Sequence, residues 1–369
     1  MNEKEGGETM RNRNFFARPF NRAFLLLFII LLAAPLFLSE FRVNLLGKFV
    51  SYAILALGID LIWGYTGILS LGHGVFFGLG AYVMGMYLKM EAAHGKIPDF
   101  MSWSGLEKLP WLWAPSANPL SLIGCVLVPA VLALILGYLT FKNRIRGVYF
   151  SILSQALSLI FVVFFVGQQA YTGGSNGLTD FKTLFGMSLA STESHYILYY
   201  VSLLCLFLVY VYCSLLVTKR LGRILIAIRD GENRVRFSGY NPTIYKIFVY
   251  VSSAAIAGLA GALFVPQVGI ISPAEMGIVP SIEMVIWVAI GGRGTLFGAV
   301  IGAIIVNSLK SGISESFPEI WSYFFGLTFV LVVLFMPDGL VGVVRKYGKK
   351  LFTENEKKEK ITAKSSSVN

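Results

Sequence analysis

The stretch TKRLGRILIAIRDGENRVRFSGYNPTIYK, residues 218–246, lies between two long apolar runs and decides how the chain is arranged. Seven of its residues are lysine or arginine, and two, Asp230 and Glu232, are acidic. A basic internal segment is typical of the cytoplasmic side of a membrane protein, so it orients the apolar runs on either side. Since nearly everything around it is compatible with lipid, we predict that this stretch docks a soluble partner.

The composition is that of a polytopic membrane protein. Of the 369 residues, 56% are hydrophobic and 14% are charged, whereas roughly a quarter of a soluble domain is charged. A membrane-crossing helix needs about 20 apolar residues, and the chain has room for about ten. The predicted spans are 24–39, 45–63, 68–88, 119–141, 148–167, 196–217, 247–268, 281–292, 296–310 and 321–337.

The distribution of positive charge predicts the orientation. With the N-terminus inside, the inner segments hold 24 of the 31 lysines and arginines. This asymmetry is what the positive-inside rule requires. We therefore predict an all-α polytopic membrane helix bundle in the inner (plasma) membrane, with both termini in the cytoplasm. The same positional bias explains the net charge of +11, so no nucleic-acid partner is expected.

The predicted organisation has three parts. A cytoplasmic segment, 1–23, precedes a transmembrane domain, 24–345, and a charged, serine-rich tail, 346–369, which is expected to be disordered. Within the domain, the Trp- and Pro-rich residues 89–118 predict a hairpin on the outer membrane surface. Residues 218–246 form the cytoplasmic loop.

Motifs for enzyme chemistry are absent from the sequence. It has no GxxxxGK[ST] for ATP and no HExxH for zinc, and its three cysteines lack metal-ligand spacing. Ser70 and His73 lie three residues apart, but nothing supplies a third member of a hydrolase site. We expect no catalytic residue, metal or cofactor on this chain, and a membrane-embedded hydrolase ranks last among the alternatives.

The glycine-rich segment 64–85, GYTGILSLGHGVFFGLGAYVMG, has two open interpretations. Its glycines either allow close helix packing or mark a broken element that lines a pathway, where Ser70 and His73 would offer polar groups from a helix that starts at Ser70. Residues 281–310, interrupted by GGRGT, are likewise either two short helices or one broken span.

Two acidic residues, Asp60 and Glu283, fall within predicted spans. An ionised carboxylate there costs on the order of 2.5–3.5 kcal/mol on insertion scales. Each of these residues therefore faces a pathway or a subunit contact, or it has a structural role near the end of its span.

The basic stretch is predicted to be helical over residues 221–237, with a break at Gly231 and an end at GYNP. It is either an amphipathic helix held by anionic membrane lipid or a helix that inserts into a groove on a soluble motor. The candidate contact residues are Arg223, Arg229, Asp230, Glu232, Arg236 and Gly239.

Several long segments resemble the branched-chain amino acid type of bacterial ABC importer permease. They are GYTGILSLGHGVFFGLGAYVMGMYL, TGGSNGLTDF, RLGRILIAIRDGENRVRFSGYNPTIYK, AGLAGALF, GGRGTLFGAVIGA and MPDGLVG, and the match covers about residues 40–345. Within this family, the Trp-rich insert and KSGISESFPEIWSYFFG are most similar to the urea-type permease subunit.

The resemblance implies partners and a power source. Such permeases pair with a second, related permease chain, two ATP-binding subunits that hold ATP and Mg, and an outer solute-binding protein. In the family, the loop corresponding to residues 221–239 contains the coupling helix. Here Glu232-Asn233-Arg234 is a divergent version of the small residues that usually precede its glycine.

We therefore predict a permease subunit that provides half of a path for urea. The candidate pathway residues are Asp60, Ser70, His73, Asn176 and Glu283. One alternative is a branched-chain amino acid importer, in which Ser70 and Glu283 would meet the charged ends of a zwitterion. Another is a stand-alone channel or secondary carrier, with the basic stretch as a lipid anchor.

Overall fold

The computed structural model describes residues 19–317, except 95, 112 and 146, and isolated positions between 323 and 342. The predicted tail 346–369 and most of the predicted span 321–337 and segment 1–23 lie outside the described residues. The helices are α1 (Pro19–Ala33), α2 (Glu40–Thr66), α3 (His73–Ala92), α4 (Asp99–Trp103), α5 (Gly124–Lys142), α6 (Val148–Gly167), α7 (Gln169–Thr172), α8 (Thr192–Thr218), α9 (Arg220–Phe237), α10 (Pro242–Val268), α11 (Ile278–Gly291) and α12 (Leu296–Ser316).

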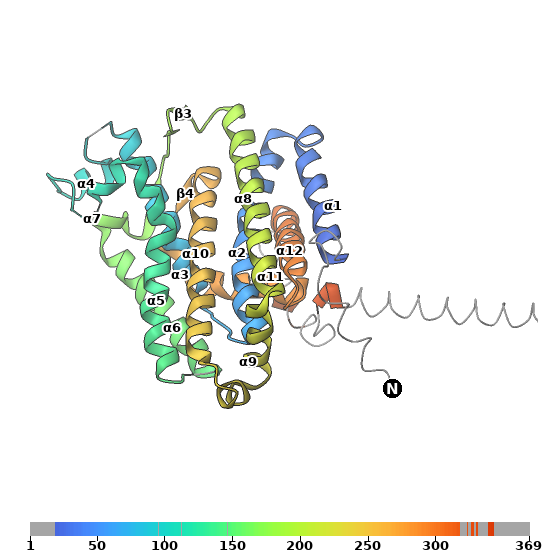
Figure 1. Cartoon of the computed structure of the whole chain (residues 1–369). Coiled ribbons are helices and arrows are strands. Elements are labelled where there is room, and N and C mark those ends of the chain that lie inside the picture. Colours follow the sequence, from blue (N-terminus) through green and yellow to red (C-terminus); the bar gives the residue numbers. More distant parts are fainter. Residues whose placement is uncertain are drawn as a thin grey trace, which may run out of the picture.

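The helices form an upright bundle with α9 at one end and α4 and α7 at the other (Figure 1). Each of the first nine predicted spans overlaps a helix for most of its length. Within the described part of the chain, six helices are long and apolar enough to cross a membrane, namely α2, α5 with the turn before it, α6, α8, α10 and α12. The prediction of a polytopic helical membrane protein is thus confirmed, while the number of spans and the side of the termini stay predictions.

Three helices, α2, α3 and α10, form the core. From Phe49 to Ile62, α2 is buried on every face; Leu55, Leu57 and Leu61 are all fully buried. α10 packs against α2, α3 and α5, while α8 and α12 flank α2. In contrast, α5 and α6 expose apolar side chains such as Leu134 and Phe164, as expected of helices that face lipid.

Glycines let α3 and α10 come into backbone contact. A Cβ added at Gly80 would lie 2.5 Å from the Cα of Gly258, and one at Gly261 would lie 2.9 Å from the nitrogen of Ala81. No side chain fits at such distances, so these helices pack more closely than larger residues would permit. For the helical part of segment 64–85, the structure supports the packing interpretation.

The chain between α2 and α3 is not helical. α2 ends at Thr66, Gly67 takes the left-handed conformation with φ 74°, and α3 begins only at His73. The helix considered under the broken-element interpretation therefore starts at His73 and not at Ser70. Serines of α6 satisfy this backbone: Ser151 Oγ donates to Leu69 O at 2.8 Å and Ser154 Oγ accepts from Leu71 N at 2.9 Å. Non-helical backbone within a membrane needs such partners.

The connection between α11 and α12 is a four-residue turn, 292–295. This answers the question left open for residues 281–310, because the structure has two separate helices there. α11, with 14 residues, is too short to cross a membrane by the length criterion.

The end opposite α9 is built from short elements. These are η3 (Ala114–Ala117), η4 (Pro119–Ile123), η5 (Gly174–Asn176) and the strands β1 (Leu178–Thr179), β2 (Thr183–Leu184), β3 (Met187–Ser188) and β4 (Ile270–Ile271). The short helix η6 (Pro273–Met276) follows β4 and packs against the first turns of α3, where a Cβ added at Gly78 would collide with Met276 Cγ. β1 pairs with β4 and β2 with β3, both antiparallel. The all-α prediction missed these strands because two residues are too few to show an alternating pattern.

Candidate functional site

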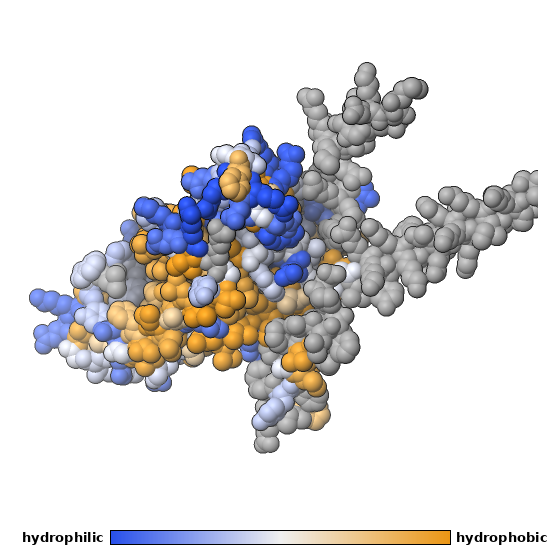
Figure 2. Space-filling view, turned by 90° about the horizontal axis from the view of Figure 1, so that it is seen from below, coloured by the Kyte–Doolittle hydropathy of each residue, from blue (hydrophilic) through white to orange (hydrophobic). Residues whose placement is uncertain are grey.

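The basic stretch folds into a bent helix at the end of the bundle. α9 has non-helical dihedral angles at Gly231 (φ 179°, ψ 81°), where its two arms meet. This confirms the predicted helix and its break. Figure 2 looks onto this end, where hydrophilic residues gather beside a hydrophobic surface. Gly239, with φ 83° and open space around it, follows the second arm.

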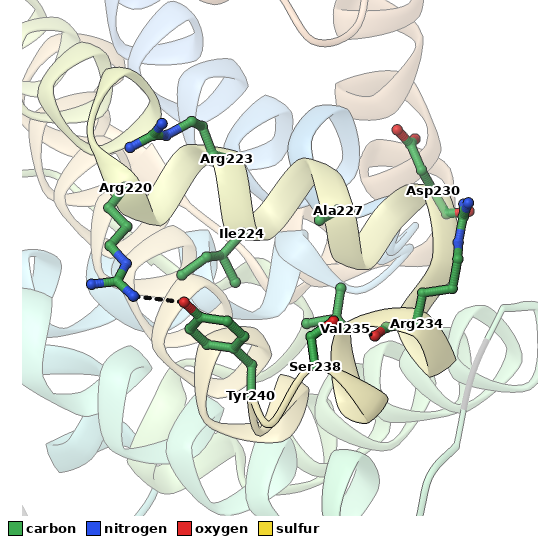
Figure 3. Close-up of a pocket in the computed structure, with 9 residues that line it drawn as sticks. All are labelled: Arg220, Arg223, Ile224, Ala227, Asp230, Arg234, Val235, Ser238 and Tyr240. Carbon is green, nitrogen blue, oxygen red and sulfur yellow. Dashed lines mark hydrogen bonds between the residues drawn. The ribbon is translucent and has the colours of Figure 1, made fainter.

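A hollow of about 610 Å³ lies between the arms of α9 (Figure 3). Arg220, Arg223 and Arg234 line it together with Asp230 and Tyr240. Arg220 Nη2 donates to the Tyr240 hydroxyl at 2.6 Å. This hydrogen bond raises the pKa of the Arg220 guanidinium above its usual value; the guanidinium of an arginine is charged at any physiological pH. The hollow is therefore a cationic concave surface at the exposed end of the bundle.

The second arm of α9 is fixed by one carboxylate. Glu232 accepts from Arg236 Nη2 at 3.1 Å and also from Lys246 Nζ, at the start of α10. Phe237, the last residue of the arm, is 93% exposed. Aromatic residues are enriched at protein interfaces.

Arg229 ties α9 to the transmembrane bundle. Its Nη1 donates to Gly64 O of α2 at 2.8 Å, and its Nε donates to Asp230 at 3.2 Å. Gly64 in turn lies against the α11–α12 turn, where Gly294 N donates to Asp60 Oδ1 at 2.6 Å. We call Asp60, Gly64, Arg229 and Gly294 the junction, because they join α2, α9 and the α11–α12 turn.

The junction unites two residues that the sequence assigned to different roles. Asp60 was a pathway candidate and Arg229 a coupling candidate, yet both meet at Gly64. Asp60 is completely buried. Its contact with the Gly294 amide holds the α11–α12 turn against α2.

Ser70 and His73 belong to a separate buried group, at the contact of α2, α3 and α10. Ser253 Oγ donates to Gly58 O at 2.6 Å, so its oxygen is left to accept from His73 Nε2 at 2.7 Å. Ser70 is 1% exposed, and its side chain interacts with the hydroxyl of Tyr250 in α10. The Ser253 bridge explains why a histidine is tolerated in this apolar setting.

Replacing Ser253 with alanine should destabilise the protein. The change leaves both His73 Nε2 and the Gly58 carbonyl without their buried partner, which costs about 1–3 kcal/mol of unfolding free energy. Thermal unfolding of the purified protein in detergent measures the effect. The exposed Ser175, changed to alanine, is the control and should unfold like the wild type; equal stability of the two variants would contradict the role of the bridge.

Glu283 belongs to a third group, a cluster of four charges. Its carboxylate accepts from Lys310 Nζ at 2.6 Å, and both residues interact electrostatically with Lys48 and Glu275. Lys48 Nζ also lies 5.8 Å from the centroid of the Tyr52 ring. We call Lys48, Glu275, Glu283 and Lys310 the mixed-charge cluster; it has two charges of each sign, contributed by α2, η6, α11 and α12.

The five predicted pathway residues do not form one site. Asp60 is in the junction, Ser70 and His73 lie near Ser253, Glu283 is in the mixed-charge cluster, and Asn176 is exposed in η5. Sequence reasoning missed Gly64, Gly294 and the two cluster lysines. Lys48 and Lys310 lie in apolar helices, so the same argument that selected Glu283 could have found them.

The comparisons with known proteins agree on one family. A model for "Branched-chain amino acid transport system / permease component" matches residues 41–333. The permease protein LivM of Salmonella typhimurium is 27% identical over 341 residues, covering 86% of this chain and 74% of that protein. A probable LivM of Methanocaldococcus jannaschii is 25% identical over 312 residues, covering 79% of this chain and 90% of that protein.

Other relatives that match the chain are permease proteins named LivH. The permease protein LivH of Escherichia coli is 22% identical over 312 residues, covering 79% of this chain and 91% of that protein. No solved structure matches the chain. The predicted resemblance to the branched-chain amino acid permease family and the predicted membrane location are confirmed, whereas the finer resemblance to the urea-type subunit is not shown. The matched relatives are permeases rather than enzymes. The chain belongs to the family of permease components of branched-chain amino acid transport systems.

Proposed function

We propose that this chain is one permease subunit of an ATP-driven importer of branched-chain amino acids. The family match over residues 41–333 carries the proposal. The comparisons do not support urea as the solute, because the relatives' names refer to branched-chain amino acids. The alternative predicted from the same resemblance therefore fits better than the main prediction.

The mixed-charge cluster also favours a zwitterion over urea. An amino acid has an ammonium and a carboxylate, and protein charges of both signs can form charge-assisted hydrogen bonds with them. Lys48 and Glu275 supply such a pair beside the Glu283–Lys310 ion pair. Urea is neutral and would gain little from four charges whose desolvation is costly.

The α9 end is the surface we assign to the ATP-binding subunits. Its cationic hollow and the exposed Phe237 suit a protein partner. Two ATP-binding subunits would contact this end, on the cytoplasmic side, and a solute-binding protein would approach the opposite end. ATP and Mg would be held by those subunits, and Arg229 would pass their movement to α2 through the junction.

The permease partner is a second, related chain. This chain is similar to two different permease proteins of one organism, LivM and LivH of Escherichia coli, at 26% and 22% identity. Both carry the name of the same transport system. A system with two related permeases fits a path shared between two similar halves.

Uptake measurements with competing solutes test which solute the system transports. The complete system would be expressed in a strain that lacks its own leucine and urea importers, and entry of labelled leucine and labelled urea would be measured. We expect saturable leucine uptake that excess isoleucine or valine suppresses and excess urea does not. Saturable urea uptake without leucine uptake would reject the assigned solute while leaving the permease role intact.

Replacing Lys48 with glutamine should raise the KM for leucine about tenfold, which corresponds to about 1.4 kcal/mol. The variant removes one positive charge from the mixed-charge cluster and leaves the Glu283–Lys310 pair in place. Initial uptake rates over a range of leucine concentrations give the KM. Lys96, an exposed lysine at the end opposite α9, is changed to glutamine as the control. An unchanged KM for the Lys48 variant would exclude the cluster from solute recognition.

A further inference from the structure

A second hollow opens on the side of the bundle, between α5 and α6 and over α3. It measures about 870 Å³, and no charged residue lines it. Its walls include Val83 of α3, Leu127 of α5, and Phe161 and Phe164 of α6. Neither the junction nor the mixed-charge cluster contributes a residue, so this crevice is separate from the sites described above.

The mouth of the crevice faces the membrane. Leu127 and Phe164, on its two walls, are 54% and 58% exposed, and both belong to helices that are long and apolar enough to span a bilayer. Large apolar side chains exposed on such helices contact lipid, since no water lies in the hydrocarbon region. The medium that reaches this crevice is therefore lipid.

The inner wall of the crevice includes Tyr82, whose hydroxyl group lacks a hydrogen-bond partner among the described residues. Tyr82 is 1% exposed and its ring lies 4.8 Å from that of Phe165, near the last turn of α6. The hydroxyl of Ser121, which also lines the crevice, lacks such a partner too within the described part of the chain. Buried hydroxyls are nearly always bonded, so these two point to a ligand that has acceptor oxygens.

The end of the crevice opposite α9 is closed by aromatic residues. Trp113 is 9% exposed, and its indole Nε1 donates to Tyr171 O at 2.8 Å. Tryptophan and tyrosine prefer the depth of lipid headgroups, which places the unpartnered hydroxyls close to the ester level. The volume also lies within the roughly 300–1,000 Å³ of ligand sites, and protein interiors seldom leave such a void empty.

We propose that the crevice binds one phospholipid of the surrounding bilayer. One acyl chain lies between α5 and α6, and an ester oxygen accepts a hydrogen bond from Tyr82. The uncharged lining excludes an amino acid zwitterion, whose charges would lose their hydration without gaining a partner. The bound lipid would fill the gap between α5 and α6, which contact each other little, and so would support the wall of α3.

Photolabelling of the full chain in its complete complex tests this site. The complex is placed in vesicles of phosphatidylethanolamine and phosphatidylglycerol that contain a phospholipid with a diazirine in one acyl chain, and the labelled peptides are mapped. Leu127→Trp fills the crevice. Leu134→Trp, on the same helix at 50% exposure and outside the crevice, is the matched control.

We expect label on the crevice residues of α3, α5 and α6, at least fivefold less in Leu127→Trp and unchanged in Leu134→Trp. Tyr82→Phe should lower the phospholipid retained after detergent exchange by about fivefold, as for a lost hydrogen bond. Equal labelling of the two tryptophan variants would overturn the proposal. So would cross-linking of the crevice to a partner protein in place of lipid.

Discussion

A variant with alanine at Gly64 should lose solute uptake, because no side chain fits at the centre of the junction. An added Cβ would lie 2.5 Å from Gly294 N and 2.7 Å from Gly294 Cα, and it would collide with the carboxylate of Asp60. Backbone atoms cannot move aside as a flexible side chain can, so α2 and the α11–α12 turn must separate. Overpacking of this kind costs about 1–3 kcal/mol, and it also breaks the Asp60–Gly294 hydrogen bond.

Uptake of labelled leucine, normalised to the amount of protein in the membrane, measures the result. Gly167→Ala is the control, since this glycine ends α6 and nothing lies within 4 Å of an added Cβ there. We expect wild-type uptake for the control and background uptake for Gly64→Ala. If Gly64→Ala transports normally, the junction does not have the close packing on which the proposed coupling rests.

Loss of the Arg229 side chain should separate ATP hydrolysis from transport. Arg229 links α9 to α2 by its hydrogen bond to Gly64 O, whereas Arg223 is exposed and lines the hollow assigned to the partner. Arg229→Ala should therefore still bind the ATP-binding subunits, and hydrolysis should continue without stimulation by solute. Uptake should fall at least tenfold. Since the side chain of Arg229 is 41% exposed, we expect little change in stability.

Two further variants test whether Arg229 couples ATP hydrolysis to transport. Arg42→Ala, on the exposed start of α2 at the opposite end, should keep solute-stimulated hydrolysis. Charge reversal at both Arg229 and Arg236 should abolish it, since this also breaks the Arg236–Glu232 pair in the second arm of α9. Unchanged solute-stimulated ATPase activity of the reconstituted complex with both charges reversed would refute the coupling role.

Most of the helices could be predicted because each long apolar run must be buried in lipid or protein. α6, for example, occupies the predicted residues, Val148–Gly167. The ends of α2 were harder to predict, because its helix continues through Glu40 and Arg42, beyond the apolar run. The break after Thr66 was signalled by glycines, but the α6 serines that satisfy its backbone are about 80 residues away in sequence.

The candidate sites were predictable only in their local parts. The charge of α9 and its break at Gly231 are visible in the sequence. The contact of Asp60 with Gly294 joins residues 234 positions apart, and the mixed-charge cluster combines four elements. Pairings of this kind depend on how the helices pack, which periodicity within one segment does not specify. For this reason the sequence left open whether Asp60 faces a pathway or has a structural role, and it could not indicate the contact with Gly294.

The central claim is that this chain has no power source of its own and is driven by ATP-binding subunits that contact α9. Reconstitution with and without these partner subunits tests it. Labelled leucine uptake would be measured in vesicles that hold either the purified chain alone or the complete complex, with ATP supplied on the side of the ATP-binding subunits. The account predicts no uptake by the chain alone and uptake by the complex that requires hydrolysable ATP. Uptake by the chain alone, or by the complex without ATP, would contradict it.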